Sequence, residues 1–341
     1  MIALLALLTA CSGDEADRGE ALSAAHGLVF DQYAAFGERA DVLASAAVSF
    51  CNNPDDSGLS ATRDAWWEAR GAFKQADFVG FGPVVEEPDR LGPPIDFWPA
   101  RTGAIDTLLA GEADLSANSF ANLGSATRGL PAIEYVLYDD ALLEQLTSEP
   151  RRCAFLVGAS EDLASNAHAL HHAWGAWETR LVDPQQASDT ADELLYTTRQ
   201  SILDEWVNRV VFAADDIRHE KLGAALGDAT GTDTRPDVLE SRYSGRSLMD
   251  ARDTLAGAHA VLLTLLPLAD DPELTAHVQL AYDTASARLA EVPEPLETTI
   301  IAQPELVVRA QDALRSYQIA VQVDAAAALA VSIAFNDNDG D

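Results

Sequence analysis

Residues 155–182 read FLVGASEDLASNAHALHHAWGAWETRLV, and the spacing of their large side chains decides the fold class. The apolar positions are Phe155, Leu156, Leu163, Leu170, Trp174, Trp177 and Leu181. They recur about every three, four and seven residues, which predicts an amphipathic helix. Similar patterns cover residues 21–50, 59–79, 131–146, 192–217, 250–266, 273–291 and 305–333. Sustained alternation of apolar and polar residues is absent, so we expect an all-α protein.

The number of helical stretches predicts how the chain is organised. Helices of this length joined by short loops form antiparallel bundles, and roughly nine of them exceed one four-helix core. We therefore expect two helical bundles in tandem. Proline disfavours helix in the residue before it, so the break is placed at Asp183–Pro184. The second bundle is expected to open with a capping box formed by Thr190 and Glu193. The predicted regions are a signal and tether (1–20), a first bundle (21–183) and a second bundle (184–341).

The charge of the chain excludes one class of partner. The 341 residues include 22 Lys and Arg and 55 Asp and Glu, which gives a formal net charge of −33. Such a surface repels phosphate backbones and anionic lipids, so we expect no nucleic acid and no electrostatic membrane binding. Lys74 and Lys221 are the two lysines of the chain, and the other basic residues are arginines.

The first residues predict a lipid anchor. Met1–Ala10 is uncharged and mostly aliphatic, and Leu8-Thr9-Ala10-Cys11 resembles a bacterial lipobox, which would make Cys11 the lipidated residue. The alternative is a short apolar start followed by a buried cysteine. The polar run to Glu20 suits a tether, and Ser12 resembles an outer-membrane sorting signal. We expect a protein on the periplasmic side of the bacterial envelope, at the outer membrane, that touches the membrane through its anchor alone.

The cysteines predict one disulfide. With Cys11 lipidated, Cys51 and Cys153 remain as an even pair in an oxidising compartment. A Cys51–Cys153 disulfide is favoured over two free thiols.

Two segments rich in glycine and proline interrupt the helical pattern, at residues 80–103 and 219–247. Long irregular connections in a helical protein are often functional, so their charged residues are candidates for a site. Asp96 and Arg101 lie in the first segment, and Glu240 lies in the second. Arg246 is expected to pair with a buried carboxylate, either structurally or at an anion site. Ser247 and Asp250 form an S-x-x-D pair that could cap a helix.

Five motifs follow one another along the chain. They read Phe81-Gly82-Pro83, Asp96-Phe97-Trp98-Pro99, Gly129-Leu130-Pro131-Ala132-Ile133-Glu134, Glu240 followed by Ser244-Gly245-Arg246-Ser247, and Phe335-Asn336-Asp337-Asn338-Asp339-Gly340-Asp341. In this order they resemble the motifs of the imelysin-like family, from about residue 60 to the C-terminus. The resemblance implies a helical periplasmic or lipid-anchored protein of two bundles, with a site in the cleft between them.

The same resemblance implies two activities. The family is named after an insulin-cleaving metallopeptidase, and other members take part in iron uptake. In its GxHxxE motif the His and Glu could share a metal, but here Pro131 takes the place of the histidine. Glu134 is either a metal ligand or a residue that stabilises the helix N-terminus. Asp337 and Asp339 either fold back into the cleft or cap the last helix, and Phe335 rules out an EF-hand loop.

A histidine group offers a second place for a metal. His168 and His172 share a helix face, and His171 lies beside them, but H-E-x-x-H is absent. A partly exposed histidine patch is favoured over a metal site.

These features favour a non-enzymatic envelope lipoprotein of iron acquisition. Its partner would be iron or another divalent or trivalent metal, a metal complex, or an envelope iron-uptake protein. A zinc-dependent metallopeptidase and an anchored scaffold are the alternatives. The candidate ligand or cleft residues are Asp96, Arg101, Gly129, Glu134, Glu240, Arg246, Ser247, Asp337 and Asp339.

Overall fold

The computed structural model describes residues 2–146, 148–187, 195–227 and 233–334, without the side chains of residues 2–14 and 16. The α-helices are α1 (Ile2–Asn52), α2 (Asp56–Lys74), α3 (Gly92–Ile95), α4 (Thr102–Ala110), α5 (Ala117–Phe120), α6 (Gly129–Leu137), α7 (Leu142–Gln145), α8 (Arg151–Ala176), α9 (Glu178–Val182), α10 (Pro184–Ala187), α11 (Arg199–Asp216), α12 (Ala224–Leu226), α13 (Ser247–Leu265), α14 (Pro272–Ala290), α15 (Leu296–Ala302), α16 (Pro304–Ile319) and α17 (Ala326–Ala328). Short 3-10 turns are η1 (Gly82–Val84), η2 (Ser125–Thr127), η4 (Pro236–Val238) and η5 (Leu266–Ala269), and π-helical segments are η3 (Ile217–Gly223) and η6 (Ala320–Ala325). These ranges contain helices and no strand, which confirms the all-α prediction.

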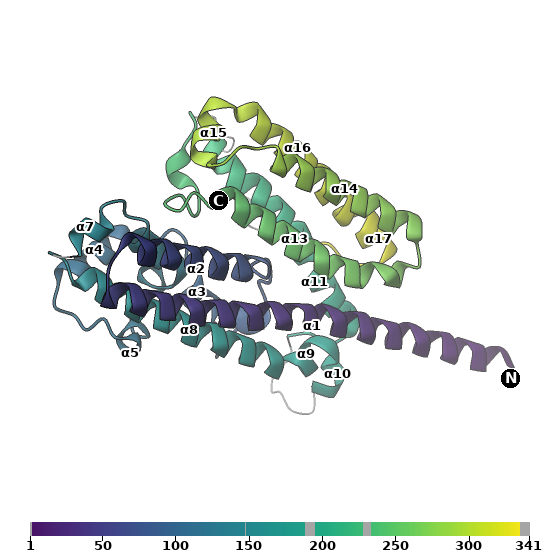
Figure 1. The fold of residues 1–341 in the computed structure, drawn as a ribbon. Coiled ribbons are helices and arrows are strands. Elements are labelled where there is room, and N and C mark those ends of the chain that lie inside the picture. Colours follow the sequence, from purple (N-terminus) through teal and green to yellow (C-terminus); the bar gives the residue numbers. More distant parts are fainter. Residues whose placement is uncertain (1, 147, 188–194, 228–232, 335–341) are drawn as a thin grey trace.

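The long helices form two neighbouring groups (Figure 1). In the first, α1 packs lengthwise against α2 and α8; in the second, α13 packs against α11 and α14, and α14 packs against α16. Helix α13 also contacts α1 and α2, so it joins the groups. A Cβ on Gly257 of α13 would lie 1.7 Å from the carbonyl oxygen of Gln75, so only glycine permits this close approach to the end of α2. The domain boundary at 183/184 stays a prediction.

An aromatic core fixes the start of the first irregular segment. Phe81 of the FGP motif is buried, and its ring centroid lies 4.7 Å from that of Trp206 on α11 and 5.8 Å from that of Trp174 on α8. Aromatic pairs at such distances stabilise a core beyond their buried area. The segment at 80–103 therefore leaves the core from a rigid point between α8 and α11.

Several helix boundaries differ from the sequence prediction. The helix expected over 155–182 divides at Trp177 into α8 and α9, and that expected over 131–146 divides into α6 and α7. The Asp139 side chain accepts a hydrogen bond from the Ala141 N–H at 2.9 Å, a local turn that competes with helix. The helix expected over 305–333 contains the π-helical η6 and ends with α17.

The predicted capping box at Thr190 and Glu193 lies outside the described residues. The prediction of one continuous helix over 192–217 is wrong. Residues 195–198 are not helical, and α11 begins at Arg199. Thr198 Oγ1 accepts from the Ser201 N–H, and Ser201 Oγ accepts from the Thr198 N–H. This reciprocal cap satisfies the first free donors of the helix, so α11 begins there.

The two ends of the first helix group differ: one is cross-linked by a disulfide, and the other projects beyond the neighbouring helices. The Cys51–Cys153 disulfide, predicted from the cysteine count, links α1 to the first turn of α8 with 5.4 Å between the Cα atoms. At the other end, residues 2–20 continue α1 as helix, and its N-terminal part projects beyond the other helices (Figure 1). Lipidation stays a prediction, since the Cys11 side chain lies outside the described residues. Among the residues searched, no helix is long and apolar enough to cross a membrane.

Candidate functional site

A buried group of charged side chains, which we call the charged cluster, lies where α2 meets the two irregular segments and α13. Its members are Arg70, Lys74, Asp77, Asp96, Lys221, Glu240, Arg246 and Asp250. These residues come from α2 and the turn that follows it, the segment at 80–103, η3, the segment at 233–246 and α13. The cluster therefore ties together parts of the chain that are far apart in sequence.

Arg70 is the centre of the charged cluster, and its side chain is 1% exposed. It donates from Nε to Asp250 Oδ2 at 2.7 Å, from Nη1 to Asp96 Oδ1 at 2.9 Å, and from Nη2 to Glu240 Oε1 at 2.9 Å. Burial alone would lower the pKa of Arg70, but these carboxylates raise it well above its usual value. Arg70 therefore stays charged and satisfies three carboxylates at once.

Both lysines of the chain also belong to the charged cluster. Lys74 donates to Asp77 and Asp96 at 2.8 Å and to Glu240 at 2.7 Å, and Lys221 on the π-helical η3 lies 3.2 Å from Asp77 and Glu240. Burial opposes the charge of Glu240, but Lys221, Lys74 and Arg70 lower its pKa well below the usual range. The cluster thus holds Glu240 ionised by matching it with buried cations.

The prediction that Arg246 pairs with a buried carboxylate is confirmed. Its guanidinium donates to Asp250 and, at 2.7 Å, to Asp253, and it lies 5.1 Å from the Trp67 ring centroid. The capping role suggested for Ser247 is wrong, because Ser247 is inside α13 and its hydroxyl donates to the Glu240 carbonyl oxygen. Asp250 accepts from cations and from Ser241 rather than from the start of the helix.

A small cavity of about 120 Å³ adjoins the charged cluster, and we call it the aromatic pocket. It is lined by Trp98, Pro99, Ala100, Thr102, Pro131, Glu134, Asp237, Leu239, Ser241, Arg242 and Tyr243. Three of the five sequence motifs supply these residues or flank them: the DFWP segment, the start of α6, and the segment that follows Glu240. Pro131 is part of the wall.

Glu134 is the buried carboxyl group of the aromatic pocket and is 4% exposed. Its Oε1 accepts from both the N–H and the hydroxyl of Ser244, each at 2.8 Å. Helix α6 begins at Gly129, so Glu134 lies past its first turn and does not cap it. Burial raises the pKa of Glu134 to about 7, although Arg70 and the Ser244 hydrogen bonds oppose the shift. A glutamate kept where its charge is costly is a candidate functional group.

The raised pKa of Glu134 predicts a pH-dependent stability. A carboxyl group with a pKa of about 7 in the fold and 4.5 in its usual state contributes full stability below pH 4.5 and loses it as the pH rises through 7. As the pH rises from 4.5 to 8.5, the unfolding free energy of the wild type should therefore fall by about 3 kcal/mol relative to that of the Glu134→Gln variant. Urea unfolding across this range measures the difference. The exposed Glu144→Gln variant should follow the wild type throughout, and parallel curves for Glu134→Gln would contradict the assignment.

The remaining predicted residues take other positions. Gly129 has φ +74°, and a Cβ there would lie 2.3 Å from the Ile95 carbonyl oxygen, so this glycine lets the DFWP segment pack on α6. The Arg101 side chain is exposed and does not join the charged cluster, although its N–H donates to the Ala126 carbonyl oxygen at 2.7 Å. Asp337 and Asp339 lie outside the described residues.

The histidines do not converge. His168 lies 2.9 Å from Asp41 on the surface, while the His171 ring packs against Phe30 with centroids 4.2 Å apart. Within the described part of the chain, no group of three or more His, Cys, Asp and Glu side chains is arranged to hold a metal ion.

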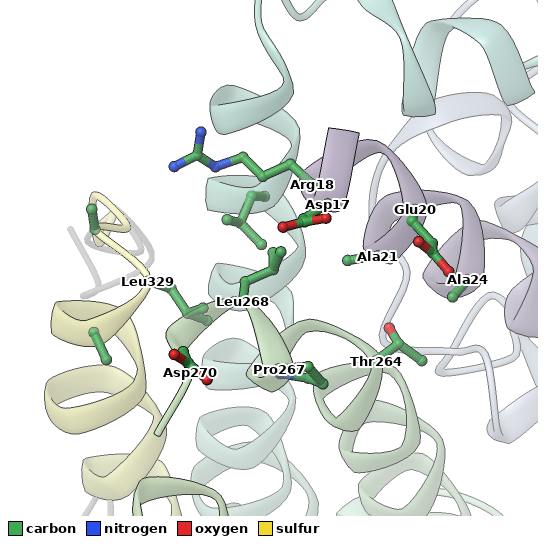
Figure 2. Close-up of a pocket in the computed structure, with 13 residues that line it drawn as sticks. Asp17, Arg18, Glu20, Ala21, Ala24, Thr264, Pro267, Leu268, Asp270 and Leu329 are labelled. Atoms are coloured by element: carbon green, nitrogen blue, oxygen red, sulfur yellow. The ribbon is translucent and has the colours of Figure 1, made fainter. Parts of the chain in front are cut away.

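A larger cavity of about 730 Å³ lies away from the motifs, between α1, η5 and α17 (Figure 2). Asp17, Arg18 and Glu20 of α1 and Asp270 after η5 line it, together with Thr264 and apolar residues. It contains none of the candidate residues from the sequence, so we place the candidate site at the aromatic pocket.

Sequence reasoning missed Arg70, Lys74, Asp77 and Lys221. One signal could have found the lysines: they are the only two in 341 residues, and both are buried with carboxylates. The scarcity of lysine instead directed attention to the loop arginines Arg101, which is exposed, and Arg246, which belongs to the charged cluster.

Comparison with known proteins agrees with the motifs. The imelysin family model matches residues 29–326. Iron-regulated protein A from Synechococcus elongatus is 25% identical over 296 residues, which cover 80% of this chain and 75% of that protein. The crystal structure of an imelysin-like protein from Psychrobacter arcticum 273-4 superposes with a TM-score of 0.79 at 20% identity, over 94% of this chain and 98% of that one. A protein named as an iron-regulated protein A precursor, from Parabacteroides distasonis, gives a TM-score of 0.73 at 17% identity, over 90% of this chain and 94% of that one.

Proposed function

Because the chain belongs to the imelysin family, we propose that it is a non-enzymatic envelope protein of iron acquisition. Its ligand is a metal complex or a partner protein that binds at the aromatic pocket. The names of its relatives support the link to iron, since two of them are called iron-regulated protein A. A position at the periplasmic side of the outer membrane, with lipid on Cys11, is part of this proposal and rests on the lipobox and on the word precursor in one relative's name.

The observation that carries the proposal is Glu134. It places a buried carboxylate in a pocket formed by three motif segments, although ionisation there opposes folding. The nearby carboxylates Asp96 and Glu240 are already bonded to Arg70 and Lys74. Glu134 alone would give a bare metal ion one protein ligand group, so a ligand that supplies its own coordination, or a protein surface, fits the pocket better.

Metal titration tests the proposal. Protein purified without an affinity tag is analysed for metals and then titrated with ferric nitrilotriacetate and with zinc chloride, in the wild type and in Glu134→Ala. We expect iron to bind in the wild type and its affinity to fall at least tenfold in Glu134→Ala, while the matched surface variant Glu144→Ala keeps the wild-type affinity.

Three results would decide against parts of this proposal. Tight iron binding that survives Glu134→Ala would contradict the assignment of the binding site to Glu134. Cleavage of a denatured protein substrate that a chelator blocks would replace it with the metallopeptidase function. If neither metal preparation binds, an anchored scaffold becomes the better account.

A further inference from the structure

Exposed aromatic side chains gather at the aromatic pocket. Among the described residues, the large apolar side chains that are well exposed include three aromatic ones: Phe97 (44%), Trp98 (43%) and Tyr243 (37%). The others in that set are aliphatic. Trp98 and Tyr243 line the pocket, and Phe97 precedes Trp98 in the chain. Exposed aromatic residues concentrated at one cavity are typical of a binding surface.

The wall of the pocket is anionic on its buried side. Among the described residues, Ser244 donates two hydrogen bonds to Glu134 Oε1 and none reaches Oε2, on a side chain that lines the cavity. Arg242 is the basic residue of the lining, but it is exposed, with its guanidinium 4.7 Å from the Tyr243 ring centroid and a donor hydrogen bond to the Asp237 carbonyl oxygen. An entering group therefore meets the Glu134 carboxyl group inside, and Arg242 together with the exposed Asp237 carboxylate at the outer wall.

The size and the other walls limit what can enter. A volume of about 120 Å³ accommodates only a few non-hydrogen atoms, since a water molecule takes about 30 Å³ in the liquid. Ala100, Pro131 and Leu239 provide apolar contacts for methylene groups. Aromatic faces attract cations when these are partly removed from water.

We propose that the aromatic pocket binds an alkylammonium group of its ligand, with the nitrogen at Glu134 and the methylenes between Trp98, Pro131 and Leu239. The inference rests on the proposed function, because it names the chemical group by which a metal complex or a partner protein enters the pocket. The group is either part of a small amine or a lysine side chain.

Calorimetry with simple probes tests this inference. The protein is titrated with n-butylammonium chloride and, at equal ionic strength, with n-butanol and sodium butyrate. We expect butylammonium to bind with a dissociation constant on the order of 1 mM, and the two controls not to bind. Glu134→Gln, which keeps the shape of the side chain, should weaken butylammonium at least tenfold. Trp98→Leu should weaken it about threefold, whereas Glu144→Gln, at an exposed position away from the pocket lining, should leave it unchanged.

A peptide distinguishes the two sources of the group. Acetyl-Gly-Lys-Gly-amide that binds at least tenfold more tightly than butylammonium, and loses binding when the lysine is acetylated, assigns the group to a protein partner. Equal or weaker binding of the peptide assigns it to a small amine.

Several outcomes would overturn the inference: butanol or butyrate binds as well as butylammonium, Glu134→Gln binds it unchanged, or no heat appears at tenfold the expected dissociation constant. The failure of the proposed function is separate from these. Iron binding that depends on Glu134, without butylammonium binding, would support the proposed function and contradict only this inference. Butylammonium binding without any iron binding would support this inference and contradict the proposed function.

Discussion

Replacing Arg70 by leucine is expected to lower the free energy of unfolding by about 4 kcal/mol, because it leaves buried carboxylates without their cation. Asp250 is fully buried, and Asp96 and Glu240 are nearly so. Arg70 bonds all three, and although Lys74 still contacts Asp96 and Glu240, Arg246 is the cation left at Asp250. Urea unfolding followed by circular dichroism at pH 7 measures the loss.

Arg101→Leu is the matched control for this change. Arg101 has the same side chain and lies in a neighbouring segment, but it is exposed, so its replacement should change stability by less than about 0.5 kcal/mol. A loss of less than 1 kcal/mol for Arg70→Leu would mean that the charged cluster does not hold the two groups of helices together. Lys74→Met offers a second check, with an expected loss in the same direction.

Removal of the disulfide is expected to cost about 4 kcal/mol, since a cross-link that closes a long loop restricts the unfolded chain most. Cys51 and Cys153 are 102 residues apart in sequence, and their bond joins α1 to α8 at the end of the longest helix pair. The Cys51→Ser, Cys153→Ser double variant should show this loss in denaturant unfolding.

Reduction of the wild type supplies the control. Reduced wild type and the double serine variant should unfold at the same denaturant concentration, while the oxidised wild type unfolds later. If the oxidised and reduced proteins unfold together, the disulfide contributes nothing to stability, and the bond predicted from the cysteine count is incidental.

Much of the candidate site was accessible from the sequence, because its loops carry recognisable motifs. Asp96, Glu240 and Arg246 were identified in the irregular segments and Glu134 in a helix-start motif, and the structure places all four at or beside the site. Their partners were not accessible. Arg70 and Lys74 lie within an amphipathic helix, where a charged side chain is normally solvated, and nothing local shows that this part of α2 is covered by both irregular segments.

The environment of Glu134 also could not be predicted from its neighbours in the sequence. Its position in the motif suggested either a metal ligand or a helix cap, and both of those roles depend on neighbours within a few residues. Its observed partner is Ser244, 110 residues away. The raised pKa of Glu134 follows from its burial in the folded protein, so it could not be read from the residues around it in the sequence.

The sequence by itself determined the helices, the disulfide and the family, because helical period, cysteine number and motif order are local or additive properties of the chain. Only the tertiary structure decided which charges meet. Arg70 forms hydrogen bonds with Glu240 and Asp250, which lie 170 and 180 residues away in sequence. The close approach of α13 to α2 at Gly257 places Asp250 beside Arg70. Burial and electrostatic pairing depend on distances in space, and a sequence of alternating helices and loops does not specify those distances until the helices pack.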